Sequence, residues 1–313
     1  MTNSWRALAR MARDRLVAAD PEDLTLVLGL WYLRLSALAR LRLFNQTAAE
    51  CTNLFNVLDA VDPPSARAWL MDRILPFELE VMRARLRYWA GDPMGYTDAL
   101  AGLLNKCKVK ARLTSRRDEA SIEMWKERGA RIALILASQM VETKDFTAAT
   151  RLLEPLAKSA PLRSAVGRIY LQAGDLAAAG RHFRAVADDE EADEAQKETN
   201  EAVMAAAKGE WAKADEVLRG LLEREQDNYS AINNLAVAML AQGKLKDAIA
   251  VLEKALHAAP ATIAVAEPFL FNLSTLYELR SASAVNNKRE LLITVARFSG
   301  DGLRTTCLKM PTS

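Results

Sequence analysis

Apolar residues recur along the chain at intervals of three and four positions, and almost no segment alternates between apolar and polar residues. Residues 4–17 are representative, because one helical face there carries Trp5, Leu8, Ala12 and Leu16. This spacing is typical of an amphipathic helix that buries one face. Glycine and proline are scarce, at 13 and 10 of 313 residues, whereas strong helix formers such as alanine and leucine abound. The sequence therefore predicts an all-α protein.

Helix ends are also marked in the sequence. Residues 20–23 read Asp-Pro-Glu-Asp, so we expect Asp20 to cap a helix and Pro21 to occupy its first position. Gly243 is expected to adopt the left-handed conformation that ends a helix. Pro260 is expected to stop the helix that precedes it, the second helix of the same repeat. Between residues 229 and 260 these signals predict two helices joined by a tight turn.

The same residues contain a spacing that recurs elsewhere in the chain. Counted from Tyr229, positions 4, 7, 8, 11, 15, 20, 24, 27 and 32 hold Ile232, Leu235, Ala236, Met239, Gly243, Ala248, Leu252, Ala255 and Pro260. This is the pattern of the tetratricopeptide repeat, a unit of 34 residues that folds as a helix, here called A, a turn and a second helix, B. We expect Ala236 and Ala248 to let helices A and B approach closely.

Further copies lie before and after this one. Those before it place Gly209, Gly174 and Lys144 at the turn, and a later A helix contains Phe271 to Tyr277. The N-terminal half repeats less regularly, with one unit from Trp31 to Leu54 and another over residues 77–104. Because isolated units cannot bury their faces, consecutive units must stack on one another. The predicted fold is a tetratricopeptide-type solenoid of helical hairpins, a right-handed α–α superhelix.

Two regions are expected within this solenoid. Residues 1–117 hold the degenerate repeats, and residues 118–313 hold the regular repeats and a C-terminal tail. The seam between them is expected at residues 105–117.

Charge and cysteine usage narrow the possible functions. Lys and Arg total 42 and Asp and Glu total 40, which leaves a net charge of +2, whereas nucleic-acid-binding proteins are normally far more basic. The longest uncharged stretch, 228–243, is too short and polar to span a bilayer. The N-terminus has no apolar signal core, so a cytoplasmic protein is expected. Cys51, Cys107 and Cys307 lie far apart and are expected to be reduced core thiols.

No motif for catalysis, a cofactor or a metal is found. The two histidines, His182 and His257, have no Cys, Asp or Glu at ligand spacing and are interpreted as surface or helix-end residues. Neither a phosphate-binding glycine loop nor a nucleophile elbow is present. The sequence predicts a binding module rather than an enzyme, with no cofactor.

Asparagines at one repeat position are the first candidate for partner binding. Asn200, Asn234 and Asn272 occupy position 6 of successive repeats, and Asn233 occupies position 5 beside them. Position 6 faces the concave groove of such a solenoid, where an amide can donate to and accept from an extended peptide. The alternative is that these amides tie neighbouring helices together. No cation occupies these groove positions, so capture of a terminal carboxylate is excluded.

Two charged runs are the other candidates. The basic run comprises Lys106, Lys108, Lys110, Arg112, Arg116 and Arg117. It is either a solvated surface or a contact for an acidic partner or an anionic membrane. The acidic run over residues 188–194 is interpreted as a solvated connection between helices, with a basic partner as the alternative.

Several segments resemble one known family. They are Ser4-Trp5-Arg6-Ala7-Leu8, Leu30 to Leu35, Leu75 to Leu79, Phe271 to Leu279, Gly300-Asp301 and Cys307-Leu308-Lys309-Met310. Over nearly its whole length the chain resembles the family of trafficking protein particle complex (TRAPP) subunit 12. Members of that family carry a long N-terminal extension, which this sequence lacks.

The resemblance implies a non-catalytic scaffold subunit of the TRAPP III tethering and Rab guanine-nucleotide-exchange complex. Such a subunit acts in transport from the endoplasmic reticulum to the Golgi and in autophagy. Its partners are other TRAPP III subunits, and it lies in the cytoplasm, peripheral to membranes of the intermediate compartment and the Golgi. The alternatives are a general tetratricopeptide adaptor that binds a linear peptide in its groove, and a helical-repeat reader of nucleic acid. The residues assign no contact with a particular subunit and no oligomeric state.

Overall fold

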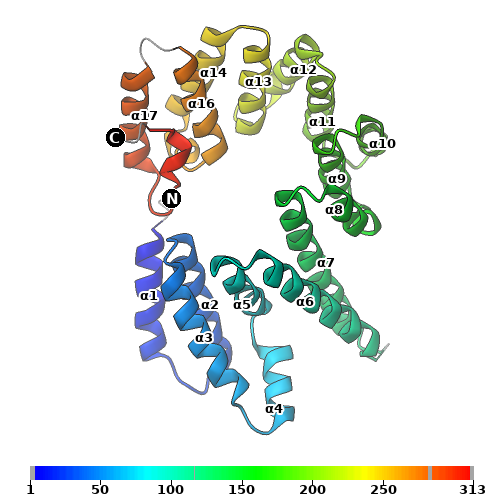
Figure 1. Cartoon of the computed structure of the whole chain (residues 1–313), viewed down its shortest axis with the longest axis vertical. Helices are drawn as coiled ribbons and strands as arrows, with labels where there is room; N and C mark the ends of the chain where they lie inside the picture. Colours follow the sequence, from blue (N-terminus) through cyan, green and yellow to red (C-terminus); the bar gives the residue numbers. More distant parts are fainter. Residues whose placement is uncertain (1–3, 116, 281–283, 311–313) are drawn as a thin grey trace. The chain divides into compact units, whose positions relative to one another are not determined.

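The computed structural model describes residues 4–115, 117–280 and 284–310 (Figure 1). These residues form helices and turns without any β-strand, which confirms the all-α, tetratricopeptide-type fold. The chain divides into an N-terminal unit that ends at Glu142 and a C-terminal unit that begins at Thr143.

The N-terminal unit is built from helices that pack on their neighbours along the chain, and from an inserted segment. Its helices are α1 (Trp5–Ala18), α2 (Leu24–Arg40), α3 (Phe44–Asp59), α4 (Pro64–Trp69), the π-helical η1 (Leu70–Ile74), α5 (Phe77–Trp89), α6 (Pro93–Leu113) and α7 (Glu119–Glu142). The pairs α1–α2, α2–α3, α5–α6 and α6–α7 pack against each other. Within this unit the core lies where α2, α3, η1 and α5 meet, at Leu35, Cys51, Phe55 and Leu79.

Helix α2 begins later than the sequence indicated. Asp23 is its N-cap, and the Asp23 carboxylate accepts a hydrogen bond from the Leu26 amide at 3.0 Å. Asp20 instead accepts from the Glu22 amide at 2.9 Å, in the turn that precedes the helix. The expectation that Asp20 caps this helix was therefore wrong. Both Asp20 and Asp23 could cap this helix. Asp23 does so because it lies three residues before Leu26, whose amide has no partner within the helix.

The boundary between the units also differs from the expected one at residues 117 and 118. Helix α6 continues through the predicted seam to Leu113, and α7 packs back along it. Gly129 lies where α7 meets α6, and a Cβ atom there would make an ordinary van der Waals contact of 3.5 Å with the Cβ atom of Cys107. Arg131 on α7 forms an ion pair with Glu78 on α5 at 3.0 Å. Helix α7 therefore belongs to the N-terminal unit.

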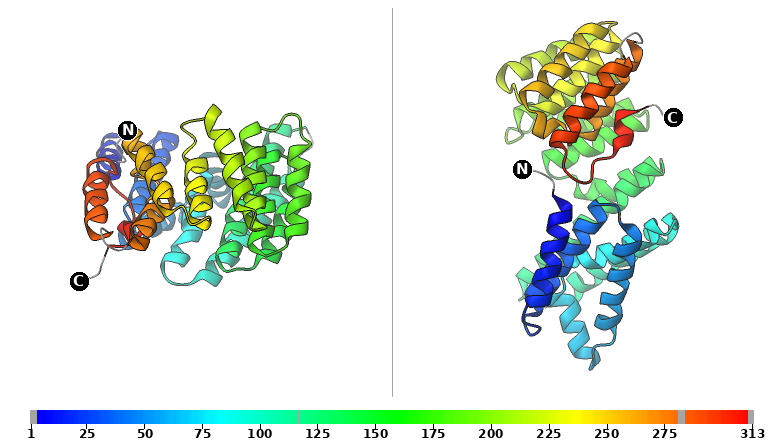
Figure 2. Two further views of the ribbon diagram at one scale, coloured as in Figure 1. Left: turned by 90° about the horizontal axis from the view of Figure 1, so that it is seen from above. Right: turned by 90° about the vertical axis from the view of Figure 1, so that its left-hand side faces the viewer.

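The C-terminal unit contains the regular repeats (Figure 2). Its elements are α8 (Phe146–Leu153), the 3-10 turn η2 (Glu154–Leu156), α9 (Ala160–Gln172), α10 (Leu176–Ala187), α11 (Glu194–Ala207), α12 (Trp211–Arg224), α13 (Tyr229–Ala241), α14 (Leu245–Ala258), α15 (Pro260–Ile263), α16 (Glu267–Leu279), α17 (Ala284–Phe298) and the 3-10 turn η3 (Thr305–Leu308). Helices α9, α11, α13 and α16 are A helices, and α10, α12, α14 and α17 are their B partners.

Turns between the A and B helices form where the repeat pattern predicts them. Gly174, Gly209 and Gly243 all have positive φ values, of 82°, 81° and 76°. At Gly243 the chain reverses from α13 into α14 by a left-handed turn that a residue with a Cβ atom adopts only at a cost. Ala236 and Ala248, at 1% and 0% exposure, are buried where these two helices meet. The small residues therefore set the separation of the helices within a hairpin.

The C-terminal tail packs across the last A helix. Leu308 is fully buried, and its carbonyl accepts a hydrogen bond from the Ser274 hydroxyl at 2.5 Å. Lys288 of α17 is buried and donates to the Glu278 carboxylate and to the Lys309 carbonyl, at 2.5 and 2.7 Å. Two of the segments that resemble the family most specifically, Phe271 to Leu279 and Cys307 to Met310, therefore contact each other.

Asp215 links the B helix α12 to the end of the next A helix. Its buried carboxylate accepts hydrogen bonds from Arg219 at 2.5 Å and from Gln242 at 3.1 Å. Burial by itself would raise the Asp215 pKa, but the hydrogen bonds from Arg219 and Gln242 outweigh it and lower the pKa. The carboxylate therefore stabilises the fold at pH values above its unfolded pKa of about 3.9.

Substitution of Asp215 by asparagine is expected to lower the free energy of unfolding at pH 7. The deficit relative to wild type should shrink as the pH falls below about 4, because the unfolded carboxylate is protonated there and the native carboxylate follows at its lower pKa. Urea titrations at several pH values measure both effects. Asp227→Asn, at an exposed residue, is the control and should behave like wild type. A deficit that does not change with pH would contradict the role given to the charge.

Substitution of Ala236 by leucine tests the close contact between α13 and α14. The larger side chain has no space there, and overpacking is expected to cost on the order of 1–3 kcal/mol. Thermal or chemical unfolding measures this cost. An unchanged melting temperature would contradict the assigned register of the repeat.

Candidate functional site

Both histidines of the chain have close polar neighbours in the part of the chain that the structure describes. No cluster of three or more His, Cys, Asp or Glu residues suited to a metal ion occurs among residues 4–115, 117–280 and 284–310. The His182 Nε2 atom lies 3.1 Å from a Glu154 carboxylate oxygen, and its ring stacks on Tyr170. The His257 Nδ1 atom lies 2.7 Å from the Glu253 carbonyl one turn earlier. Both histidines thus have ordinary helix-surface contacts.

The three cysteines are free and buried, as the sequence predicts. Burial raises the pKa of the Cys51 thiol to about 11, and the pKa of the Cys107 thiol also to about 11. Both thiols therefore remain protonated at neutral pH, and these two residues are core side chains rather than nucleophiles.

A surface on the A helices α13 and α16 has the composition of a binding site. This surface, called here the A-helix face, comprises Asn233, Asn234, Val237, Phe271 and Asn272. Val237 and Phe271 are large apolar side chains with exposed fractions of 41% and 47%. The Asn272 amide nitrogen donates to the Asn233 amide oxygen at 3.0 Å and so joins the two helices.

The remaining groups of this face are available to a partner. No hydrogen bond of the Asn234 side chain is found among the described residues, and that side chain is half-buried. An amide in this position can donate to and accept from a peptide backbone. The face combines apolar surface with amide groups on packed helices.

Asn200 does not belong to this face. It is 2% exposed, and its amide nitrogen donates to the Ser164 hydroxyl at 2.7 Å. Its amide oxygen accepts from Arg168 at 3.5 Å. Asn200 therefore ties α11 to α9, and the three asparagines at position 6 do not form one exposed ladder. The alternative reading from the sequence, that these amides tie neighbouring helices, describes Asn200 and the pair Asn233 and Asn272.

A cation from the tail borders the A-helix face. The Lys309 ammonium lies 5.3 Å from the centre of the Phe271 ring and 2.5 Å from a Glu278 carboxylate oxygen. A cation over an aromatic ring is held by the negative face of the ring. The sequence analysis did not assign Val237, Phe271 or Lys309 to a site. The sequence did contain a signal for Val237 and Phe271. They are apolar residues at positions 9 and 5 of their repeats, and these positions face away from the B helix.

The basic run is not one continuous surface. Lys106 forms an ion pair with Glu80 at 2.8 Å, and Lys110 forms one with Asp72 at 2.5 Å. These two lysines therefore anchor α6 to α5 and η1. The exposed cations of the run are Lys108, Arg112 and Arg117, and Arg116 lies outside the described residues.

In the acidic run, two members lie near cations. Asp189 lies 3.8 Å from Arg163, and Glu194 lies 3.6 Å from Lys197.

Comparison with known proteins agrees with this fold. A tetratricopeptide repeat family model matches residues 205–267, which cover α12, α13 and α14. The trafficking protein particle complex subunit 12 proteins of Mus musculus and Homo sapiens are each 30% identical to the chain over 90% of its length. The chain thus contains a match to the tetratricopeptide repeat and is similar to trafficking protein particle complex subunit 12. It spans 39% of the mouse protein and 42% of the human protein.

A solved structure was also found to be similar to this chain. It is a tetratricopeptide repeat protein from Parabacteroides merdae, with 14% identity and a TM-score of 0.38, covering 70% of this chain and 98% of that one. None of the described helices combines the length and the apolar character needed to cross a bilayer.

Two asparagine substitutions distinguish the buried amide from the half-buried one. Asn200→Ala leaves the buried Ser164 hydroxyl without its partner, and we expect a loss of about 1–3 kcal/mol in the free energy of unfolding. Asn234→Ala should change it by no more than about 0.5 kcal/mol. Denaturant titrations of both variants test the assignment. Equal losses in the two variants would show that the environments of the two asparagines are assigned wrongly.

Proposed function

We propose that this chain is a non-catalytic adaptor of a TRAPP complex and that its A-helix face holds a segment of a partner subunit. In the fuller form of the proposal the complex is TRAPP III. The protein then acts in vesicle tethering, in transport from the endoplasmic reticulum to the Golgi and in autophagy. It works from the cytoplasm at intermediate-compartment and Golgi membranes. The 30% identity to subunit 12 proteins over 90% of the chain supports the choice of complex.

The observation that carries the proposal is the pairing of exposed apolar side chains with amides on the A-helix face. Val237 on α13 and Phe271 on α16 leave large apolar surface in water, and Asn234 lies three residues before Val237 on the same helix. Apolar surface grouped with hydrogen-bonding side chains is typical of protein interaction sites. An extended segment crossing α13 and α16 would bury Val237 and Phe271 and hydrogen-bond to Asn234.

Co-purification from human cells tests the proposal. The tagged chain should recover other TRAPP subunits, and Val237→Asp should reduce the recovery about tenfold, which corresponds to about 1.4 kcal/mol of binding free energy. The matched control is Ile293→Asp on the B helix α17, where an aliphatic side chain is 46% exposed, close to the 41% of Val237. The control should recover the subunits as the wild-type chain does.

Each part of the proposal has its own contradicting result. Failure of the wild-type chain to recover any TRAPP subunit would contradict the choice of complex. Recovery of an unrelated partner that Val237→Asp abolishes would support the general tetratricopeptide adaptor instead. Equal effects of Val237→Asp and Ile293→Asp would contradict the role of the A-helix face.

A further inference from the structure

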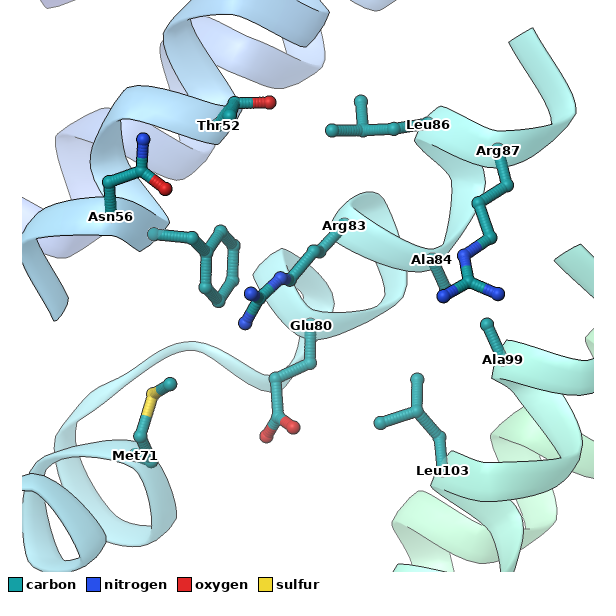
Figure 3. A pocket seen from close by; sticks show the side chains of 11 residues that line it. Thr52, Asn56, Met71, Glu80, Arg83, Ala84, Leu86, Arg87, Ala99 and Leu103 are labelled. Atoms are coloured by element: carbon teal, nitrogen blue, oxygen red, sulfur yellow. The ribbon is translucent and has the colours of Figure 1, made fainter. Parts of the chain in front are cut away.

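We propose that a pocket in the N-terminal unit binds an acidic segment of a partner protein, with one apolar side chain of that segment filling the pocket. The pocket has a volume of about 360 Å³ and lies between α3, α5 and α6 (Figure 3). It belongs to a different unit from the A-helix face and is independent of the proposed function.

Apolar side chains form part of the pocket lining, beside the charged side chains of Glu80 and Arg83. Phe55 and Ala84 are buried at its base, and Leu86, Ala99 and Leu103 are half-buried on its walls. A volume of this size falls at the lower end of the range for ligand-binding pockets, which is about 300–1,000 Å³. Such a space suits one large apolar side chain better than a whole folded surface.

The rim of the pocket is polar and exposed. Thr52 and Asn56 border it on α3, and Arg83 and Arg87 border it on α5. Figure 3 shows the Arg87 side chain extending toward Ala99 on α6. Apolar side chains next to polar, solvent-accessible ones are usual in a protein–protein contact.

The charges at the pocket favour an acidic occupant. The Glu80 carboxylate is neutralised by Lys106 at 2.8 Å, and Arg83 is paired with Asp59 at 2.8 Å. Arg87 donates only to the Gly95 carbonyl, at 3.2 Å, and forms no ion pair with any residue that the structure describes. Its guanidinium is thus the one lining charge without a counter-ion among those residues. A carboxylate beside the inserted apolar side chain would supply that counter-ion through a bidentate contact.

A polypeptide segment fits this arrangement better than a small free anion. One unpaired guanidinium and two rim side chains provide few donors for an isolated anion. An acidic peptide adds burial of an apolar side chain to the same ion pair, and the two contributions together give a specific contact. The proposed occupant therefore carries at least one Asp or Glu next to Leu, Ile, Val, Met or Phe.

Fluorescence polarisation with the full chain tests the proposal. The probes are two pools of fluorescein-labelled nine-residue peptides, each with a varied apolar residue at the centre. In one pool that residue is flanked by Asp and Glu, and in the other by Lys. We expect saturable binding of the acidic pool and at least about tenfold weaker binding of the lysine pool.

Matched variants locate the binding at this pocket. Arg87→Glu should weaken binding of the acidic pool at least about tenfold, whereas Arg85→Glu should leave it within about twofold. Both changes alter the net charge equally, but Arg85 stacks on Trp89 and does not line the pocket. Ala99→Leu should also abolish binding because it fills the pocket, whereas Ala101→Leu, at an exposed site on α6, should not.

The outcomes separate this inference from its competitors. Equal binding of the two peptide pools would overturn it, and so would equal effects within either pair of variants. Val237→Asp, on the A-helix face, should bind the acidic pool as wild type does. Loss of peptide binding in that variant would show that the peptides bind the A-helix face rather than this pocket.

Discussion

The close approach of the A and B helices is the constraint on which the rest of the structure depends. A single hairpin cannot bury its own apolar faces and is stable only when the next hairpin covers them. The next hairpin can cover them only if the two helices of each hairpin lie close together. Ala236 and Ala248 provide that approach in one repeat, where both are almost fully buried. In the repeat of α9 and α10 the approach is closer still. A Cβ atom at Gly167 would lie 2.5 Å from the nearest carbon of the Phe183 ring.

This constraint also determines which surface remains for partners. Residues that face the B helix are used in packing, and residues on the opposite side of an A helix stay accessible unless another group covers them. On α13 and α16 that side carries Val237 and Phe271, and the tail brings Lys309 to its edge. On α11 the equivalent amide, that of Asn200, is covered because α9 supplies Ser164 and Arg168 as its partners. The same repeat position therefore has different roles in neighbouring repeats.

The hairpins of the C-terminal unit could be predicted from the sequence because their signals are local. The spacing of apolar residues and the turn residues Gly174, Gly209 and Gly243 lie within one repeat and act through neighbouring turns of helix. Contacts between distant residues have no such signal. The ion pair of Lys110 with Asp72 joins residues 38 positions apart, and the tail packs on α16 through Leu308 and Ser274, which are 34 positions apart. For this reason the ion pairs of the basic run and the packing of the tail could not be predicted from the pattern.

Alanine substitution at two glycines of the C-terminal unit tests the packing constraint most directly. Gly167 and Gly220 both lie within helices, but a Cβ atom at Gly220 would have no heavy atom within 4 Å, whereas one at Gly167 would meet the buried Phe183 ring. Gly220→Ala should raise the free energy of unfolding by about 0.5–1 kcal/mol, because alanine favours the helix. Gly167→Ala should lower the free energy of unfolding. The steric clash costs on the order of 1–3 kcal/mol, and the gain in helix propensity offsets only part of that cost. Stabilisation by both substitutions in chemical denaturation would contradict the account.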